Sequence, residues 1–286
     1  MKIKALLEET INQCLSVERV EQDPIGEVHR FDNHADQEVA ALVASCLAYG
    51  RVEMLKNAIQ LALAPLGEHP AKTLREMEAQ DFEGGWQDFV YRMTRGRDLA
   101  DLLHAMSVTL RNEGSLESLY ASFLPSRPVL DRQEHLKAAS GFVRELRSRR
   151  LRPATERGFR YLLPDPADGS ACKRLHLFFR WVARPADGID LGLWTVIDPS
   201  ALVMPVDTHI HRIARYLGLL ERKSPDGQAA LQLTRRLAEL HPADPLRYDF
   251  ALCHLGISGQ CAHRWSPEHC PTCPIESACT LANSSR

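Results

Sequence analysis

Apolar residues recur along most of this chain at intervals of three and four positions, the spacing of an amphipathic helix. In residues 37–47 they fall at Val39, Leu42, Val43 and Leu47. The same spacing appears in five further segments: 99–110, 140–150, 172–182, 208–217 and 231–240. We find no convincing alternation of β-branched residues. The pattern predicts an all-α protein.

Stretches rich in proline, glycine and aspartate separate these predicted helices, at residues 125–128, 163–169 and 185–200. Such stretches are typical of loops. They divide the chain into a long middle bundle of helices and a C-terminal piece.

Composition and charge restrict the class of protein. Of the 286 residues 44% are apolar and 25% charged, which is ordinary for a globular protein with a buried core. No segment reaches the ~20 apolar residues of a membrane-spanning helix, and the first residues lack a signal-peptide core. We therefore expect a cytoplasmic protein with reduced thiols. The 35 basic and 37 acidic residues neither imply nor exclude a nucleic-acid partner.

Four of the eight cysteines cluster near the C-terminus in the spacing C-x8-C-x2-C-x5-C, at Cys261, Cys270, Cys273 and Cys279. Reduced thiols so close in sequence indicate a metal or iron-sulfur site, because a C-x2-C pair presents two sulfurs to one ion. Spacing alone does not distinguish zinc from iron, and His263 or His269 could replace a thiolate. Ordinary buried thiols are expected at the other four cysteines, Cys14, Cys46, Cys172 and Cys253.

Asp207 stands directly before an amphipathic helix in the segment PVDTHIHRIARYLGL, residues 205–219. As an N-cap, its carboxylate accepts backbone amide hydrogen bonds from the first turn, which is a complete structural explanation. Asp207, His209 and His211 also suggest a metal hydrolase. Residues two apart on a helix point to different sides, however. We expect one histidine to face a cleft and the other to make a structural hydrogen bond.

The two motifs together resemble the helix-hairpin-helix DNA glycosylase superfamily, which includes endonuclease III. There a V-D-T-H-like run opens a helix, and an iron-sulfur loop C-x6-C-x2-C-x5-C follows. Here Asp207 precedes Cys261 by 54 residues. The whole chain is similar to a bacterial family described as a domain of unknown function, through the runs CKRLHLFFRWVAR, DLGLW, MPVDTHIHR and YDFALCHLG. Residues 188–206 depart from the superfamily pattern, because they replace its glycine-rich hairpin and contain no lysine.

The resemblance implies a two-lobed, all-helical DNA-glycosylase-like fold with the active site between the lobes. Residues 36–200 would form a helical bundle, and residues 1–35 with 201–286 the second lobe. The implied activity is removal of a damaged base in base excision repair, by a monomer bound to double-stranded DNA. The four C-terminal cysteines would hold a [4Fe-4S] cluster with a mainly structural role.

Lys173 is the candidate nucleophile. In archaeal 8-oxoguanine glycosylases the lysine lies upstream of the aspartate on a helix, and Lys173 precedes Asp207 by 34 residues. If Ser170 caps a helix that begins at Ala171, the helix dipole and Arg174 favour the neutral amine of Lys173 that a Schiff base needs. Asp207 would activate this amine or stabilise oxocarbenium charge. The likeness favours an oxidised purine such as 8-oxoguanine, with possible lyase activity. If Lys173 is structural, Asp207 could activate water in a monofunctional enzyme.

A glycosylase also needs contacts to DNA phosphates and to the flipped base. Basic residues gather at 144–152 and 173–184. Candidates for DNA contact are Arg51, Arg174, His209, Arg212 and Arg264. Candidates for stacking on the base are Tyr49, Phe178, Phe179, Trp181 and Trp194, although helical spacing favours core positions for most. Arg51 follows Gly50, whose simpler role is a left-handed helix C-cap.

Two other classes of function stay open. A non-catalytic iron-sulfur DNA-binding protein could keep the fold and the cluster without the chemistry. A zinc-stabilised helical interaction protein would use the same four cysteines for another metal.

Overall fold

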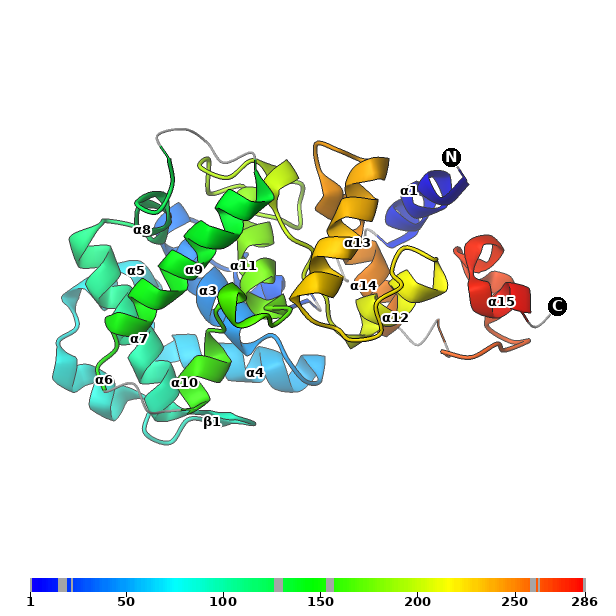
Figure 1. Cartoon of the computed structure of the whole chain (residues 1–286). Helices are drawn as coiled ribbons and strands as arrows, with labels where there is room; N and C mark the ends of the chain where they lie inside the picture. Colours follow the sequence, from blue (N-terminus) through cyan, green and yellow to red (C-terminus); the bar gives the residue numbers. More distant parts are fainter. Residues whose placement is uncertain are drawn as a thin grey trace.

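The computed structural model describes residues 2–14, 20–21, 23–125, 131–152, 157–257, 261 and 263–284. Most of these residues are helical, as the spacing of apolar positions predicts (Figure 1). The α-helices in chain order are α1 (Lys2–Cys14), α3 (His34–Leu47), α4 (Val52–Leu63), α5 (Pro70–Glu76), α6 (Ala79–Gly85), α7 (Gly96–Asn112), α8 (Leu116–Ala121), α9 (Arg132–Ser148), α10 (Arg157–Leu162), α11 (Lys173–Ala183), α12 (Thr208–Tyr216), α13 (Gly227–Leu240), α14 (Asp249–Ile257) and α15 (Thr280–Ser284).

Every segment with helical spacing forms a helix, but some ends differ from the prediction. Helix α9 begins well before residue 140, because Asp131 caps it by accepting hydrogen bonds from the amides of Gln133 and Glu134. The predicted loop at 163–169 contains a short 3-10 turn, η3 (Pro166–Asp168). The predicted loop at 125–128 falls largely outside the described residues.

A hairpin of two-residue strands is the one pair of strands in the described part of the chain. Strand β1 (Val90–Tyr91) pairs antiparallel with β2 (Thr94–Arg95), and Arg92 at the turn has a left-handed backbone with φ 51°. Strands this short show no alternation that a sequence pattern could reveal. The hairpin reaches the core through Tyr91, whose ring lies 4.9 Å from that of Tyr49.

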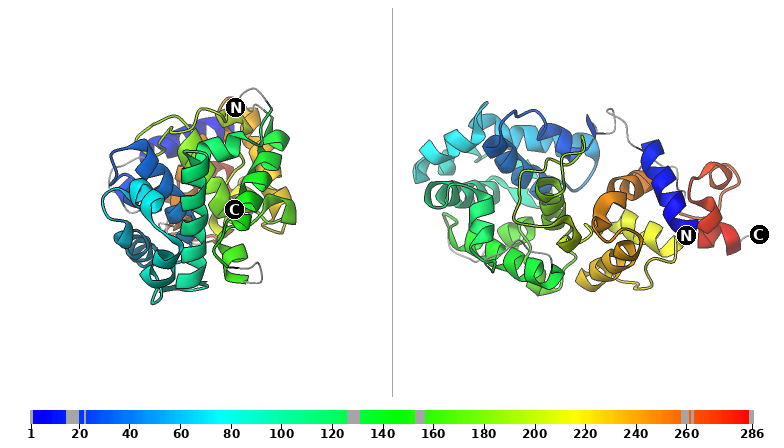
Figure 2. Two further views of the ribbon diagram at one scale, coloured as in Figure 1. Left: turned by 90° about the vertical axis from the view of Figure 1, so that its left-hand side faces the viewer. Right: turned by 90° about the horizontal axis from the view of Figure 1, so that it is seen from above.

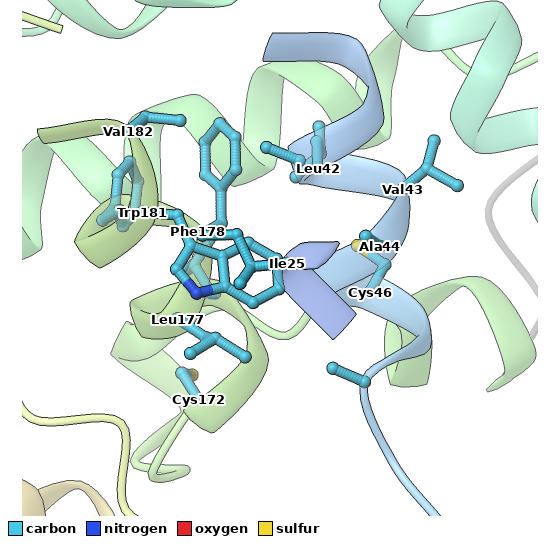
Figure 3. Close-up of a cluster of buried hydrophobic side chains, with 14 of the residues drawn as sticks. Ile25, Leu42, Val43, Ala44, Cys46, Cys172, Leu177, Phe178, Trp181 and Val182 are labelled. Atoms are coloured by element: carbon cyan, nitrogen blue, oxygen red, sulfur yellow. The ribbon is translucent and has the colours of Figure 1, made fainter. Parts of the chain in front are cut away.

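Helix α3 is the centre of the core. Its side chains from Val39 to Leu47 are all buried, as expected for a helix that is covered on every side. Helix α11 packs along it. Figure 3 shows Leu177, Phe178 and Trp181 of α11 turned toward α3, with Ile25 beside them.

The long loop between α11 and the next helix is held against α3 by one buried carboxylate. Glu38 accepts hydrogen bonds from the indole nitrogen of Trp194 at 2.7 Å and from the amides of Leu116 and Glu117 at 2.9 Å. Burial raises the pKa of Glu38, and these three donors oppose the rise. Residues 188–206 are thus an ordered, irregular loop with one 3-10 turn, η4 (Pro199–Ala201).

The N-terminal helix joins the helices of the second half of the chain. Helix α1 packs against α14, and α14 packs against α12. The C-terminal helix α15 lies near α1, at the same end of the molecule (Figures 1 and 2). No helix among the described residues has the length and apolar character needed to cross a bilayer.

Candidate active site

A cleft of about 1190 Å³ opens where α11, α12 and α14 face the turn between α3 and α4. Both residues predicted as catalytic, Lys173 and Asp207, line it. Its other charged lining residues are Asp23, Arg51, Glu53, Lys56, Arg174, Arg180 and Asp249. The cleft therefore collects cations and carboxylates from segments that are far apart in sequence.

Asp207 is the N-cap of α12, as predicted. Its Oδ1 accepts hydrogen bonds from the backbone amides of His209 and Ile210, both at 2.9 Å. These bonds and the positive end of the helix dipole fix the direction of the carboxylate and stabilise its charge. Asp207 is partly buried at the edge of the cleft.

Lys173 is the first residue of α11, and the predicted start of this helix was wrong. Cys172, not Ser170, occupies the N-cap position, and its left-handed backbone with φ 43° keeps the residues before it out of the helix. Ser170 instead accepts a hydrogen bond from the amide of Cys172 at 3.3 Å. Lys173 remains in the first turn, at the positive end of the helix dipole.

Asp249, which sequence reasoning missed, contributes a buried carboxylate to the cleft. It begins α14, is 2% exposed, and its Oδ2 accepts a hydrogen bond from the guanidinium of Arg180. Its Oδ1 is buried with no hydrogen-bond partner in the described part of the chain. Burial raises the pKa of Asp249, against the opposing charges of Arg180 and Lys173. The signal in the sequence was an acidic residue between two aromatic residues, Tyr248 and Phe250, at the start of an apolar helix.

Cys253 lies one turn beyond Asp249 and lines the same cleft, so it is not the ordinary core thiol that we expected. Burial raises the pKa of this thiol well above its usual value. Asp207, Lys173 and Asp249 all act on it electrostatically. These three charged residues thus share one electrostatic environment. Cys46 and Cys172, which were also predicted to be ordinary buried thiols, are buried. The side chain of Cys14 is not among those that the structure describes.

The two histidines of α12 separate as their spacing predicts. His209 lines the cleft. His211 is buried, and its Nε2 lies 3.0 Å from the carbonyl oxygen of Arg222. Within the described residues, no three His, Cys, Asp or Glu side chains converge on one point as metal ligands would, which gives the metal-hydrolase interpretation no support.

Arg174 forms a fixed cation at the wall of the cleft. Its guanidinium lies 5.0 Å from the ring centre of Tyr49 and 4.4 Å from that of Tyr161, and it donates hydrogen bonds to the carbonyl oxygens of Cys46 and Tyr161. Such a stacked guanidinium loses little mobility when it meets an anion. Tyr49 is the one predicted stacking residue that lines the cleft.

Arg51 is exposed beside the cleft at the N-cap position of α4. Gly50 before it has φ 104°, as the predicted left-handed turn requires. A Cβ on Gly50 would lie 2.7 Å from the side chains of both Arg92 and Tyr91. A larger residue at position 50 would strain the backbone and displace the ends of these two side chains.

Several other candidates for DNA contact are engaged inside the protein. Arg180 and Arg184 are buried in ion pairs with Asp249, Asp190 and Asp244, so they cannot reach phosphate. In the 144–152 segment, Arg149 pairs with Glu113 and Arg152 with Asp101. The remaining aromatic candidates are buried core residues: Phe178, Phe179, Trp181 and Trp194.

The four C-terminal cysteines line a second, small cavity of about 20 Å³, together with the apolar residues Ile275, Leu281 and Ala282. Burial raises the pKa of the Cys261 and Cys273 thiols, and the neighbouring thiols raise it further. The four thiols line one cavity, but among these described residues no three of them converge on one point in this structure. Cysteine thiolates are the usual ligands of zinc and of iron-sulfur clusters, so the residue types suit such a group.

The cysteine cavity lies against α12, the helix that Asp207 caps. Tyr216 of α12 lines the cavity, and its hydroxyl donates a hydrogen bond to the carbonyl oxygen of His263 at 3.3 Å. Arg212 on α12 and Arg264 in the cysteine loop are both exposed, as phosphate contacts would need to be.

A family model described as "Protein of unknown function (DUF2400)" matches residues 23–258. The match includes the whole α11 to α14 region with Lys173, Asp207 and Asp249, and it ends before the first cysteine of the C-terminal loop. No curated protein and no solved structure matches the chain.

Proposed function

We propose that this chain, which belongs to the DUF2400 family of proteins of unknown function, is a DNA glycosylase that removes a damaged base from duplex DNA. The observation that carries the proposal is that Lys173 and Asp207 line one cleft, each at the N-terminal end of its own helix. A lysine and a carboxylate on rigid helix ends suit attack on a sugar carbon and stabilisation of the positive charge that develops there.

In the proposed reaction, the neutral amine of Lys173 forms a bond to C1′ of the damaged nucleotide. The bond between C1′ and the base breaks, and its electrons leave with the base. Asp207, held in place by two amides of α12, keeps its negative charge beside the sugar. Nζ then loses a proton, and the C1′–O4′ bond opens with a proton taken up by the ring oxygen, so that a Schiff base forms at C1′. This Schiff base would give the enzyme its lyase activity. The resemblance of the lysine placement to 8-oxoguanine enzymes favours an oxidised purine as substrate.

DNA binding would use the cations of the cleft and of the helix and loop beyond it. Arg51, Arg174 and His209 line the cleft. Arg212 on α12 and Arg264 in the cysteine loop are exposed. A lobed arrangement around the cleft, with the nucleotide flipped into it, follows from the same proposal. The cysteine loop would hold a [4Fe-4S] cluster that supports α12 through the contact between Tyr216 and His263.

Base release under single-turnover conditions tests this function. The purified protein is incubated with duplexes that contain 8-oxoguanine, an oxidised pyrimidine or uracil. We expect release of one of these bases, and a loss of about 100-fold or more in rate for Asp207→Asn with duplex binding retained. Asp226→Asn is the matched control, because Asp226 caps α13 by accepting from the amide of Ala229 and does not line the cleft.

The controls separate the proposal from its rivals. Duplex binding without base release by the wild type would favour a non-catalytic DNA-binding protein. Zinc in place of iron, with no DNA binding, would favour a helical interaction protein.

A further inference from the structure

Of the aspartates that line the cleft, Asp207 and Asp249 lie in different environments. Oδ1 of Asp207 is occupied by two backbone amides of its own helix, at the edge of the cleft. Asp249 is 2% exposed, and only its Oδ2 is engaged, by Arg180. When two carboxylates share a site, the one that is stabilised as an anion and the one that is buried take different roles in proton transfer.

The unpartnered oxygen of Asp249 needs a donor. A buried acceptor without a hydrogen bond is costly, so native proteins usually supply a partner. Two cations of the cleft act electrostatically on Asp249, Arg180 and Lys173. Arg180 already pairs with Asp249 and Asp190, whereas Lys173 forms no ion pair within the described residues. The ammonium of Lys173 is therefore the natural donor to Oδ1.

Helix periodicity explains why these groups face one another. Lys173, Leu177 and Arg180 are spaced by four and three residues on α11, and all three line the cleft. Asp249 and Cys253 are spaced by four on α14 and line it as well. Arg180 binds Asp249, and Lys173 lies about two turns before Arg180 on the same face of α11, so its side chain lines the cleft into which Asp249 also faces.

We infer that Asp249 is a positioning residue that takes the proton of the Lys173 ammonium and so prepares the nucleophile. The inference rests on the proposed function and deepens it. For this step Nζ of Lys173 moves to within hydrogen-bond distance of Oδ1 of Asp249. The proton then leaves Nζ and binds Oδ1, so an ammonium and a carboxylate become an amine and a carboxylic acid with no change in net charge. The freed electron pair of Nζ then bonds to C1′, and the departing base can take the proton from Oδ1.

An internal proton acceptor has a distinctive pH dependence. Because the proton passes within the pair, the reactivity of Lys173 should be nearly constant around neutral pH. With Asp249→Asn, the amine must lose its proton to solvent, so its reactivity should rise about tenfold per pH unit. The other charged or titratable groups of the cleft come from every element that lines it: Asp23 before η1 (Pro24–Glu27), Tyr49 and Arg51 between α3 and α4, Glu53 and Lys56 on α4, Arg174 and Arg180 on α11, Asp207 and His209 at α12, and Cys253 on α14.

The test reads Lys173 directly and needs no DNA. Trace acetic anhydride labels the whole protein between pH 6 and pH 8, and mass spectrometry compares Lys173 with Lys72, an exposed lysine on α5. In the wild type, the ratio of Lys173 to Lys72 labelling should fall about tenfold per pH unit, since only Lys72 becomes more reactive. In Asp249→Asn the ratio should stay constant. The same profile in both proteins would overturn the inference.

Asp190→Asn is the matched control. Asp190 is also buried and also paired with Arg180, but it does not line the cleft. This variant should keep the wild-type labelling profile. If Asp249→Asn acted only by releasing Arg180, Asp190→Asn would change the profile in the same way. If Asp249→Asn does not fold, the double variant Arg180→Gln, Asp249→Asn removes both charges of the pair and should give the constant ratio.

The outcomes also distinguish this inference from the proposed function. Loss of the pH-independent labelling of Lys173 supports the inference even if no tested lesion is a substrate. Base release from a lesion, combined with identical labelling profiles in the wild type and Asp249→Asn, would support the glycosylase and reject the role of Asp249.

Discussion

Lys173 and Asp207 lie 34 residues apart in sequence and line one cleft, each at the N-terminal end of its own helix. The two helix ends differ, however. Asp207 caps α12 with its side chain, whereas α11 has no side-chain cap and begins after a left-handed residue, Cys172. Asp207 is thus tied to its helix by hydrogen bonds, and the side chain of Lys173 is not used to hold its own helix.

Substitutions of Asp207 should separate its structural role from its chemical role. Asp207→Ser can still cap α12, so we expect the free energy of unfolding to stay within about 0.5 kcal/mol of the wild type. Asp207→Ala loses the cap and should be less stable by about 1 kcal/mol. Both variants lack the carboxylate, so both should lose base release. Urea unfolding measures the first effect, and a Ser variant with full activity would contradict the catalytic role.

Gly256 on α14 should be irreplaceable for steric reasons. A Cβ at this position would lie 2.7 Å from Cβ of His209, the cleft-lining residue of α12. Gly256→Ala should therefore destabilise the fold by about 1–3 kcal/mol. Gly84 in α6 is the control, since a Cβ there meets nothing within 4 Å, and Gly84→Ala should stabilise by about 0.5–1 kcal/mol. Equal effects of the two substitutions on the melting temperature would be inconsistent with this packing.

Two buried histidines should make the fold sensitive to acid. Burial lowers the pKa of His135 to about 3 and of His176 to about 4, below the ordinary value of about 6.5. Both are neutral in the folded protein, so their contribution is fully present above about pH 6.5 and is lost as the pH falls toward 4. In that window each histidine should lower the free energy of unfolding by about 1.4 kcal/mol for every pH unit of acidification.

The variant His176→Gln tests this slope. Urea unfolding between about pH 7 and about pH 5 should show a pH dependence of stability that is smaller by about one proton than in the wild type. An unchanged slope would mean that His176 is not held neutral in the fold.

The cysteine loop should bind iron rather than zinc. Fresh protein is expected to be brown and to contain iron and acid-labile sulfide in equal amounts. Cys273→Ala should lose both, and with them part of the order around Tyr216. Cys46→Ala is a suitable control, because Cys46 is a core thiol on α3 outside the loop. Colourless protein with zinc would contradict the cluster.

The sequence predicted the helices well because each buries a recurrent apolar face, and it predicted the N-cap role of Asp207 because that role is local. It could not predict Asp249 as a cleft residue. Its partner Arg180 is 69 residues away, and which face of α11 meets α14 depends on the packing of both against their neighbours. The ionic role of Arg180 and Arg184 was hidden for the same reason. The hairpin at 90–95 was too short to leave a pattern.

Borohydride trapping tests the central claim most directly. Wild type, Lys173→Gln and the control Lys137→Gln are each mixed with duplexes that contain 8-oxoguanine, an oxidised pyrimidine or uracil. The account predicts a covalent protein–DNA adduct on one lesion, formed by the wild type and by Lys137→Gln and absent with Lys173→Gln. No adduct on any lesion, or an equal adduct with Lys173→Gln, would contradict Lys173 as the nucleophile of a DNA glycosylase.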